Sequence, residues 1–237
     1  MKQKNYSITI AIPVYNEEET IKKVIENALS AVKKLTKEYE LLLVNDGSTD
    51  GTKNIIEDYA KKNKNIRIIN HNVNKGFTGA IKSCYRNSSK ELIFLAPGDG
   101  QIDFRDLSLF VQKIQEGYDV VIGYRRINPE GFQRRLNSWV FHSLCRILLG
   151  LKFKEISTSI LWKKKVLNLI EIATPDSSAM IEPEVILKAK KKGYKFAEVP
   201  ITYLLRQGGK PKGANPKMIF ITFVEMIKFT LKQRREK

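Results

Sequence analysis

A polar turn rich in aspartate and glycine follows the apolar run at residues 40–44 and leads into a helical pattern. This turn, residues 45–52, reads Asn-Asp-Gly-Ser-Thr-Asp-Gly-Thr. Comparable polar turns follow other apolar runs, at residues 15–19 and 74–79. One such turn is ordinary capping chemistry for a helix. Its repetition predicts parallel strands that all end at one edge of a sheet, which is where α/β proteins bind ligands.

Hydrophobic periodicity predicts the order of the elements. Apolar and β-branched runs predict strands at residues 7–14, 40–44, 66–70, 91–96, 119–124 and 195–203. Helical spacing predicts a first helix that Asn16 caps and that ends near residue 35, followed by helices at residues 52–62, 74–87, 106–116, 134–149, 166–173, 182–192 and 218–235. This alternation predicts an α/β fold, with a mostly parallel twisted sheet and helices on both faces. Pro200 places the last strand at an edge of the sheet.

The charge of the chain points to a polyanionic partner. The 42 Lys and Arg residues outnumber the 25 Asp and Glu residues, which gives a net charge of +17. Such an excess suits nucleic acid, an anionic lipid surface or a phosphorylated substrate, although solvated lysine faces explain part of it equally well. The basic residues cluster from residue 124 onward, so the positive potential is a feature of the second half.

Several classes of protein fit the sequence poorly. A nucleic-acid-binding module is the alternative from a different class, but the basic residues lack interleaved aromatics and a recognition motif, so we expect no nucleic acid. No Gly-x-Gly-x-x-Gly follows the first strand, which argues against a dinucleotide oxidoreductase. Cys84 and Cys145 match no metal spacing and are expected to be reduced, packed thiols. The N-terminus shows no signal-type segment, so we expect a cytoplasmic protein.

The motifs at residues 13–18, 45–50 and 74–76, in this order, resemble those of family 2 glycosyltransferases. The chain looks most like the branch that makes dolichyl- or polyprenyl-phosphate sugars, and the resemblance runs from about residue 8 to residue 212. It implies a GT-A fold in a single Rossmann-like domain at residues 1–215, with a nucleotide-sugar half at 1–105 and an acceptor half at 106–215. Residues 216–237 are expected to form a C-terminal amphipathic, basic helix. The implied activity is inverting transfer of a sugar from a UDP- or GDP-sugar to a polyprenyl phosphate, with Mg²⁺ or Mn²⁺ as the metal.

The resemblance places the donor site at the ends of the first strands. Pro13, Tyr15 and Glu17 follow the first strand, where a tyrosine can cover a base or ribose and a carboxylate can bind ribose hydroxyls. The alternative roles are a half-buried loop aromatic for Tyr15 and a helix-dipole carboxylate for Glu17. Asn45 stands where many relatives have Asp, and Asp46 is expected to contact the base or ribose.

Two further positions complete the expected donor site. Lys75 and Gly76 suit a close backbone approach to the diphosphate with a cation beside it, although an Asn-Lys-Gly turn is also common in its own right. Asp50 either contacts the ligand or caps the next helix.

The expected metal ligands lie after the fourth strand. The family has an Asp-x-Asp-x-Gln pattern there, and this chain has Pro97, Asp99 and Gln101 at those three positions. Asp99 and Gln101 are therefore the expected ligands, with the diphosphate and water supplying other oxygens. The loss of one carboxylate predicts weaker metal affinity. Asp103 is a possible substitute ligand, but a cap on the following helix explains it better.

In the branch that the chain resembles, a basic segment after the last strand holds the acceptor phosphate, and residues 203–212 are the matching stretch here. Arg206 can bind two phosphate oxygens, Lys212 adds a point charge, and Arg125 is a further candidate near the diphosphate or acceptor phosphate. A polyprenyl phosphate is already an anion and needs no general base. An alcohol acceptor, from a saccharide or another molecule, is the second enzymatic reading, and Glu182 or Asp176 would then serve as the base.

Two segments suit contact with a membrane surface. Residues 216–235 have an apolar face and a basic end, and residues 134–149 are apolar with Arg134 and Arg135 at their start. Both patterns are typical of helices that lie in an anionic interface, and core packing is the alternative for each. We therefore expect peripheral contact with the cytoplasmic face of an anionic membrane.

Overall fold

The computed structural model describes residues 5–127, 129, 131–156, 159–205 and 216–235. Its strands are β1 (Ile8–Val14), β2 (Tyr39–Asn45), β3 (Ile66–Asn70), β4 (Leu92–Leu95), β5 (Val120–Arg125), β6 (Ile160–Lys163) and β7 (Phe196–Ile201). Its helices are α1 (Ile21–Leu35), α2 (Thr52–Lys62), α3 (Gly76–Asn87), the 3₁₀ turn η1 (Phe104–Asp106), α4 (Leu107–Gln115), α5 (Phe132–Leu149), α6 (Lys164–Leu167), α7 (Ile181–Lys191) and α8 (Pro216–Arg235).

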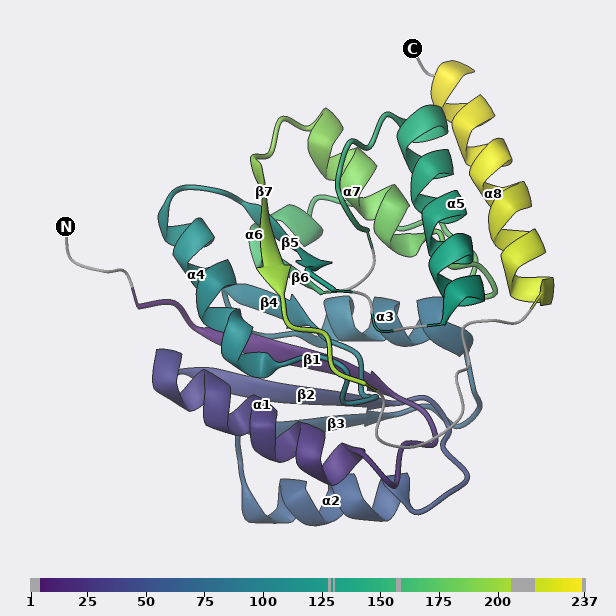
Figure 1. The fold of residues 1–237 in the computed structure, drawn as a ribbon. Coiled ribbons are helices and arrows are strands. Elements are labelled where there is room, and N and C mark those ends of the chain that lie inside the picture. The colour runs from purple at the N-terminus through teal and green to yellow at the C-terminus, as the bar shows by residue number, and fades with distance from the viewer. Residues whose placement is uncertain (1–4, 128, 130, 157–158, 206–215, 236–237) are drawn as a thin grey trace.

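The described strands form one mixed sheet in the order β3-β2-β1-β4-β6-β5-β7 (Figure 1). The pairs β3–β2, β2–β1, β1–β4 and β5–β7 are parallel, whereas β6 is antiparallel to both of its neighbours. The mostly parallel sheet predicted from the sequence is therefore confirmed, and β7, which contains Pro200, lies at an edge as expected. Because β1, β2, β3 and β4 run in parallel, their carboxyl ends meet at one edge.

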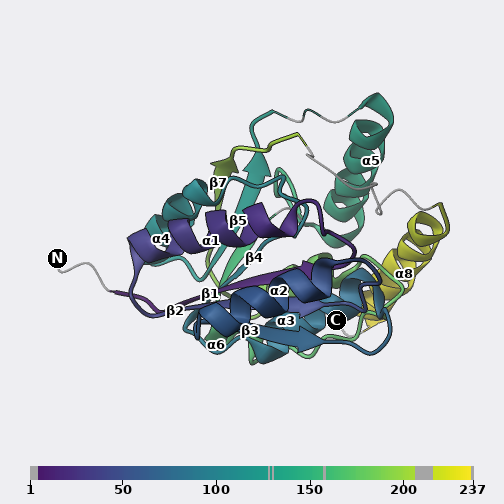
Figure 2. The same ribbon diagram turned by 90° about the horizontal axis from the view of Figure 1, so that it is seen from below.

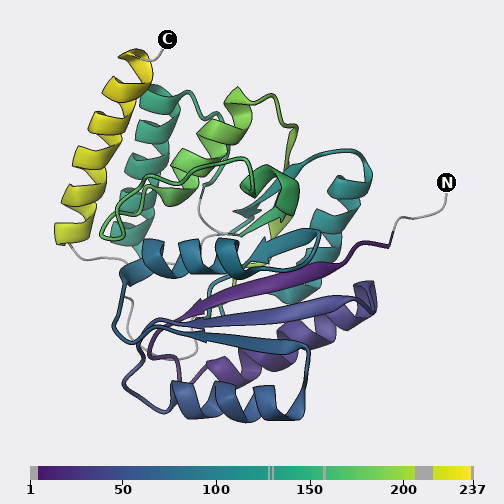
Figure 3. The ribbon, with the colours of Figure 1, turned by 180° about the vertical axis from the view of Figure 1, so that it is seen from behind.

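Alternate residues of the central strands feed two separate cores. In β2, Leu41 and Leu43 join the core under α1, α2 and α4, whereas Leu42 and Val44 join the core under α3, α5 and α7. This alternation follows from the two-residue period of a strand. Figure 2 shows α1 with α2 and α4 on its two sides, and Figure 3 shows α3 lying along the opposite face of the sheet. Both faces are covered, which explains the nearly unbroken apolar runs in β1 and β2.

The strand β6 was not predicted from the sequence, and the helix predicted after it is wrong. Residues 160–163 pair between β4 and β5, but four residues are too few to show a period. A helix was expected at residues 166–173, whereas α6 ends at Leu167. The backbone N–H groups of Ala173 and Thr174 donate to the Glu184 carboxylate, at 2.9 and 2.7 Å, so a side chain on α7 replaces the helical carbonyls.

Asn16 is not the cap of the first helix, so that prediction is wrong. The helix α1 begins at Ile21, and Asn16 has a φ of 49°, in the left-handed region. Its Oδ1 atom accepts a hydrogen bond from the backbone N–H of Thr49 at 2.8 Å. The side chain therefore joins the β1 turn to the β2 turn, a contact between segments that local sequence patterns cannot reveal.

The C-terminal helix packs on the domain. α8 lies beside α5 (Figures 1 and 3), and its Met226 is buried in the core that α3, α5 and α7 share. The Thr222 hydroxyl accepts a hydrogen bond from the backbone N–H of Ala179 at 3.1 Å. Among the helices of the described residues, none combines the length and apolar character needed to cross a bilayer.

Candidate active site at the carboxyl edge of the sheet

The turns after β1 and β2 are fastened to each other. The backbone N–H of Asn16 donates to Ser48 Oγ at 3.0 Å, and that of Glu17 donates to Thr52 Oγ1 at 2.8 Å. Asp50 accepts from the backbone N–H groups of Thr52 at 3.0 Å and Glu18 at 3.2 Å. Asp50, one residue before the N-cap Gly51, therefore accepts from the first backbone N–H of α2 and ties the two turns together, a structural role close to the helix cap considered for it.

The expected donor residues of the first strand lie along this fastened turn. Pro13 and Tyr15 are half-buried, and Glu17 is buried. The Glu17 carboxylate accepts a hydrogen bond from Thr20 Oγ1 at 3.2 Å. Thr20 Oγ1 also lies 3.3 Å from the backbone oxygen of Gly98, an alternative acceptor, so the β1 turn contacts the segment that follows β4.

Asp46 is buried and has several partners within the chain. Its Oδ1 atom accepts from the backbone N–H of Lys75 at 2.9 Å, and its Oδ2 atom accepts from that of Gly76 at 2.9 Å. His71 Nδ1 lies 2.6 Å from Oδ1. The carboxylate that follows β2 therefore occupies the N-terminus of α3, a position that favours an anion. Its expected contact with a base or ribose stays a prediction.

Asn45 takes part in a second link between β2 and β3. Its Nδ2 atom donates to Asn70 Oδ1 at 2.9 Å, and its Oδ1 atom accepts from the backbone N–H of Ser48 at 3.1 Å. An ionised Asp at this position could not donate to Asn70. The structure thus gives a local reason for the amide where many relatives have a carboxylate.

Glycines let the β2 turn and the loop before α3 approach closely. Gly47 has a φ of +71°, and a Cβ atom there would lie 2.8 Å from the backbone nitrogen of Asn74. Gly76 has a φ of +80° and lies against the backbone oxygen of Asp176. The Lys75 side chain is exposed at this junction. A cation is therefore available at this edge, and its expected place beside a diphosphate stays a prediction.

The expected metal segment forms a tight turn after β4. The backbone N–H of Gln101 donates to Asp99 Oδ1 at 3.1 Å, and Pro97 contributes no carboxylate. Gln101 is buried, and its Oε1 atom has no hydrogen-bond partner among the described residues. A buried amide oxygen without a partner, next to a half-buried carboxylate, is a donor set that fits a hard divalent cation. Within the described ranges, no three His, Cys, Asp or Glu side chains are grouped so that they could hold a metal ion.

The metal segment is joined to the chain that leads into the predicted acceptor segment. The backbone N–H of Leu204 donates to the backbone oxygen of Gln101 at 2.8 Å, and Ile102 pairs with Tyr203 in an antiparallel bridge. Arg206 and Lys212 themselves lie outside the described residues. In the sequence, Arg206 comes two residues after Leu204, which bonds to the turn that contains Asp99 and Gln101.

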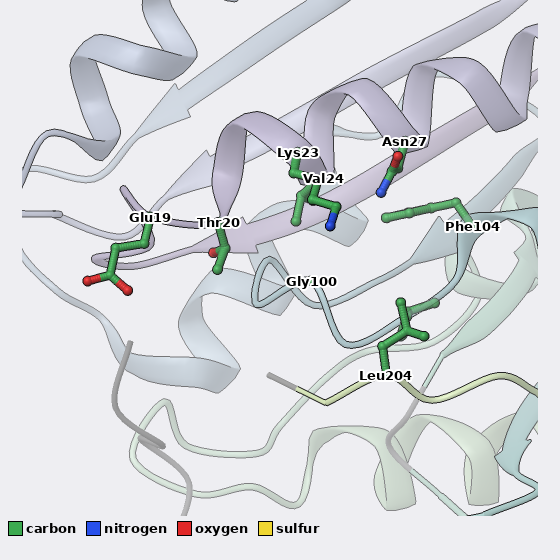
Figure 4. Close-up of a pocket in the computed structure, with 9 residues that line it drawn as sticks. Glu19, Thr20, Lys23, Val24, Asn27, Gly100, Phe104 and Leu204 are labelled. Carbon is green, nitrogen blue, oxygen red and sulfur yellow. The ribbon is translucent and has the colours of Figure 1, made fainter. Parts of the chain in front are cut away.

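A small cavity of about 40 Å³ lies between the start of α1 and the turn at Gly100 (Figure 4). The residues Thr20, Lys23 and Val24, at the start of α1, form one wall, and Gly100 and Leu204 form another. Its volume suits one or two water molecules. This cavity is too small for a nucleotide-sugar.

Arg125 lies at the end of β5, but a carboxylate already pairs with it. Its guanidinium lies 2.8 Å from Glu155 Oε1, donates to Ser138 Oγ at 3.2 Å, and lies 5.0 Å from the centre of the Tyr203 ring. The contact with Ser138 joins β5 to α5. Contact of Arg125 with a phosphate stays a prediction, and it would require the guanidinium to share its donors with Glu155.

Of the two carboxylates suggested as a base, Glu182 lacks the exposed setting that a base needs, whereas Asp176 stays a candidate. Glu182 is 1% exposed in the core between α3 and α7, and burial raises its pKa to about 8. Asp176 lies beside α3, where its carboxylate pairs with Lys82 at 2.7 Å. Glu182 therefore gives little support to an alcohol acceptor that needs a general base.

Sequence reasoning overlooked His71 and Glu155. His71 connects Asp46 to Ser83 of α3, since its Nε2 atom lies 2.8 Å from Ser83 Oγ. One signal could have found it: His71 comes directly after the third predicted strand, at the edge where ligands bind. Glu155 had no such signal, because it lies far from Arg125 in the sequence.

Comparisons with known proteins agree with this geometry. The family model "Glycosyl transferase family 2" matches residues 9–172. The chain is 24% identical over 220 residues to a dolichyl-phosphate beta-glucosyltransferase of Trichomonas vaginalis, covering 86% of this chain and 68% of that one. It is 38% identical over 124 residues to an undecaprenyl-phosphate 4-deoxy-4-formamido-L-arabinose transferase of Photorhabdus laumondii, covering 52% of this chain and 38% of that one. The chain thus spans about two thirds of the first relative and well under half of the second.

Solved structures share the fold at low sequence identity. Glucosyl-3-phosphoglycerate synthase of Mycobacterium tuberculosis, in complex with phosphoglyceric acid, superposes with a TM-score of 0.71 at 18% identity, over 94% of this chain and 79% of that one. Its complex with Mn²⁺, UDP and phosphoglyceric acid gives a TM-score of 0.68 at 19% identity, over 93% and 78%. The GT-A-type fold expected from the sequence is confirmed. By its matched family model, its fold and the residues at the sheet edge, this chain belongs to glycosyl transferase family 2.

Proposed function

We propose that this glycosyltransferase moves a sugar from a UDP- or GDP-sugar to a polyprenyl phosphate, with inversion at the anomeric carbon. The observation that carries the proposal is the pairing of residues 101–102 with residues 203–204. This pairing puts Tyr203 and Leu204, at the beginning of the proposed acceptor segment, beside the turn that contains Asp99. The names of the relatives support the acceptor class, since both act on a polyprenyl-type phosphate.

The donor would lie across the turns that follow β1, β2 and β4. Pro13, Tyr15 and Glu17 would line the nucleoside side, with Asn45 and Asp46 holding the turn opposite. Lys75 would lie beside the diphosphate, where Gly76 allows the backbone to approach. Asp99 and Gln101 would hold a divalent cation, and such a cation, when bound, neutralises charge on the diphosphate. The complexes of the M. tuberculosis enzyme with Mn²⁺ or Mg²⁺ and UDP support this choice.

The chemistry that follows needs no proton transfer from the acceptor. An oxygen of the acceptor phosphate attacks the anomeric carbon, the bond from that carbon to the diphosphate breaks, and the nucleoside diphosphate leaves. Because two anions must meet, cations matter more than a base. Arg206 and Lys212 would hold the acceptor phosphate. The buried position of Glu182 supports this class of acceptor over an alcohol that would use Glu182 as its base.

Peripheral contact with an anionic membrane would bring the enzyme to a lipid acceptor. On α5, the exposed residues Phe132, Leu136, Trp139 and Val140 lie on one face by their helical spacing. They line or flank an open groove of about 420 Å³ that also includes Arg135, Arg146 and Lys154. An apolar face edged by cations is what an anionic interface binds. The neighbouring α8 exposes Phe223, Ile227 and Leu231.

The proposal is tested in two steps. Thermal shifts with UDP-, GDP- and CDP-sugars, with and without Mn²⁺, identify the donor, because a ligand at one hundred times its Kd stabilises by about 2.7 kcal/mol. Sugar transfer is then measured to a short polyprenyl phosphate, to a saccharide and to phosphoglycerate. Transfer to the polyprenyl phosphate is the expected result. Transfer only to an alcohol of a sugar or of phosphoglycerate would refute the proposed acceptor.

A further inference from the structure

A line of hydrogen bonds runs from α3 through a buried histidine to the carboxyl edge of the sheet, where the nucleotide-sugar is proposed to bind. Ser83 Oγ lies 2.8 Å from His71 Nε2, and His71 Nδ1 lies 2.6 Å from Asp46 Oδ1. Asp46 then accepts from the backbone N–H groups of Lys75 and Gly76. The line therefore starts on α3 and ends at the loop that carries the exposed Lys75.

The chemistry of this line fixes the tautomer of the histidine. An ionised carboxylate only accepts hydrogen bonds, so Nδ1 of His71 carries a proton. In a neutral ring, Nε2 then accepts from the Ser83 hydroxyl. The backbone N–H of His71 also donates to the backbone oxygen of Asn45, at 2.9 Å. The imidazole is thus held from its main chain and from both ring nitrogens.

The location of His71 rules out direct contact with a ligand. The side chains of His71 and Asp46 are each 4% exposed, and both ring nitrogens of His71 have partners within the chain. Within these contacts, the Nδ1–H group of His71 and the backbone N–H groups at the start of α3 all donate to the Asp46 carboxylate. Without the imidazole, the carboxylate would lose one of its donors and could turn away from Lys75 and Gly76, releasing the loop between β3 and α3.

We propose that His71 is a positioning residue for the donor: by orienting the Asp46 carboxylate it holds the Asn74–Lys75–Gly76 loop where the nucleoside diphosphate binds. The inference rests on the proposed donor site and adds a residue that the sequence motifs do not mark. It predicts a selective effect, since the loop faces the donor and the acceptor segment enters from β7.

The variants separate positioning from general destabilisation. His71→Leu removes both ring contacts, His71→Asn keeps an N–H donor for Asp46, and Ser83→Ala removes only the outer partner. Thr9→Val is the matched control, because Thr9 Oγ1 also donates to a buried carboxylate, Glu40 Oε2 at 2.6 Å, near the opposite end of β1. All four are compared by melting temperature.

Titration calorimetry with UDP, GDP and CDP in the presence of Mn²⁺ gives the first readout. His71→Leu should raise the Kd of the preferred nucleotide about tenfold, the loss of one charged hydrogen bond, whereas His71→Asn and Thr9→Val should stay within about threefold. With a donor and acceptor in hand, the donor KM should rise while the acceptor KM is unchanged. Equal nucleotide affinity in His71→Leu and wild type would overturn the inference.

Hydrogen exchange of the free protein gives the second readout and needs no ligand. Amide protons at residues 72–78 should exchange faster in His71→Leu than in Thr9→Val at matched melting temperature. Unchanged exchange would refute the positioning role. If the wild type binds no nucleotide while exchange still changes, the proposed function fails and the donor role of His71 fails with it, although the loop contact is upheld.

Discussion

Two glutamates of α7 show how position decides the state of a carboxylate. Burial raises the pKa of Glu182 to about 8, and its Oε2 atom has no hydrogen-bond partner among the described residues. Burial also acts to raise the pKa of Glu184, but hydrogen bonds from Lys188, from Thr174 and from the backbone lower it overall. The first residue is therefore a neutral core group near neutral pH, and the second is an anion that fixes the loop before α7.

Glu182 predicts that stability falls as the pH rises. Its pKa is raised in the folded protein from the ordinary value of 4.5 to about 8, so the folded state keeps a proton that the unfolded state releases between these values. The stability that this proton gives is full below the lower pKa and is lost as the pH rises through the upper one. A tenfold difference in proton affinity corresponds to about 1.4 kcal/mol, so the loss of stability should reach a few kcal/mol. Urea unfolding of wild type and Glu182→Gln across this range should show a flatter curve for the variant. Parallel curves would contradict the assignment.

Asp99 is the only carboxylate at the pattern positions of the metal segment, so its removal should abolish metal-dependent donor binding. Gln101→Ala should be milder, because a neutral oxygen holds a dication less strongly than a carboxylate. Calorimetry with and without Mn²⁺ measures the metal-dependent part of nucleotide affinity. Asp58→Ala is the control, since Asp58 is an exposed carboxylate on α2. Full Mn²⁺ dependence in Asp99→Ala would remove Asp99 from the site.

At the scale of elements, long periodic segments were predictable and contacts between segments were not. The helix at residues 52–62 has the predicted bounds, and β3 matches residues 66–70. The four-residue β6 was missed because its strand identity comes from pairing with β4 and β5. Likewise, the roles of Asn16, His71 and Glu155 depend on partners far away in the sequence. Local patterns located the edge of the sheet, and only the fold shows which side chains meet there.

The exposed face of α5 predicts binding to anionic vesicles. Trp139 is 66% exposed and Phe132 is 80% exposed, although both side chains are large and apolar. Replacing both with serine should weaken sedimentation with vesicles that contain anionic lipid by about tenfold or more, since each removes a large apolar side chain from the interface. Leu169→Ser is the control, because Leu169 is also exposed but lies outside α5 and α8. Equal vesicle binding by the double variant and the control would exclude α5 as the contact surface.

At the scale of the whole molecule, the sheet brings the two proposed sites to one edge. The parallel strands β3, β2, β1 and β4 place the donor turns together, and β7 returns the chain to the same region after β5 and β6. The bridge between Ile102 and Tyr203 joins these two parts. In the proposed reaction, the first half of the chain therefore binds the nucleotide, and the segment after β7 binds the acceptor.

This division predicts that Arg206→Ala will impair the acceptor and spare the donor. Arg206 follows the segment that pairs with the metal turn, and a guanidinium can hold two oxygens of a phosphate that must approach an anionic donor. The acceptor KM for a short polyprenyl phosphate in detergent should rise about tenfold or more, as for a lost charged hydrogen bond, with nucleotide affinity near wild type. Lys212→Ala should act in the same direction but less, because an ammonium is a single point charge. Lys210→Ala, on the same segment, is the matched control for a general loss of positive charge. If Arg206→Ala instead weakens the nucleotide and leaves the acceptor KM unchanged, Arg206 belongs to the donor side, and the acceptor phosphate must be held by other cations.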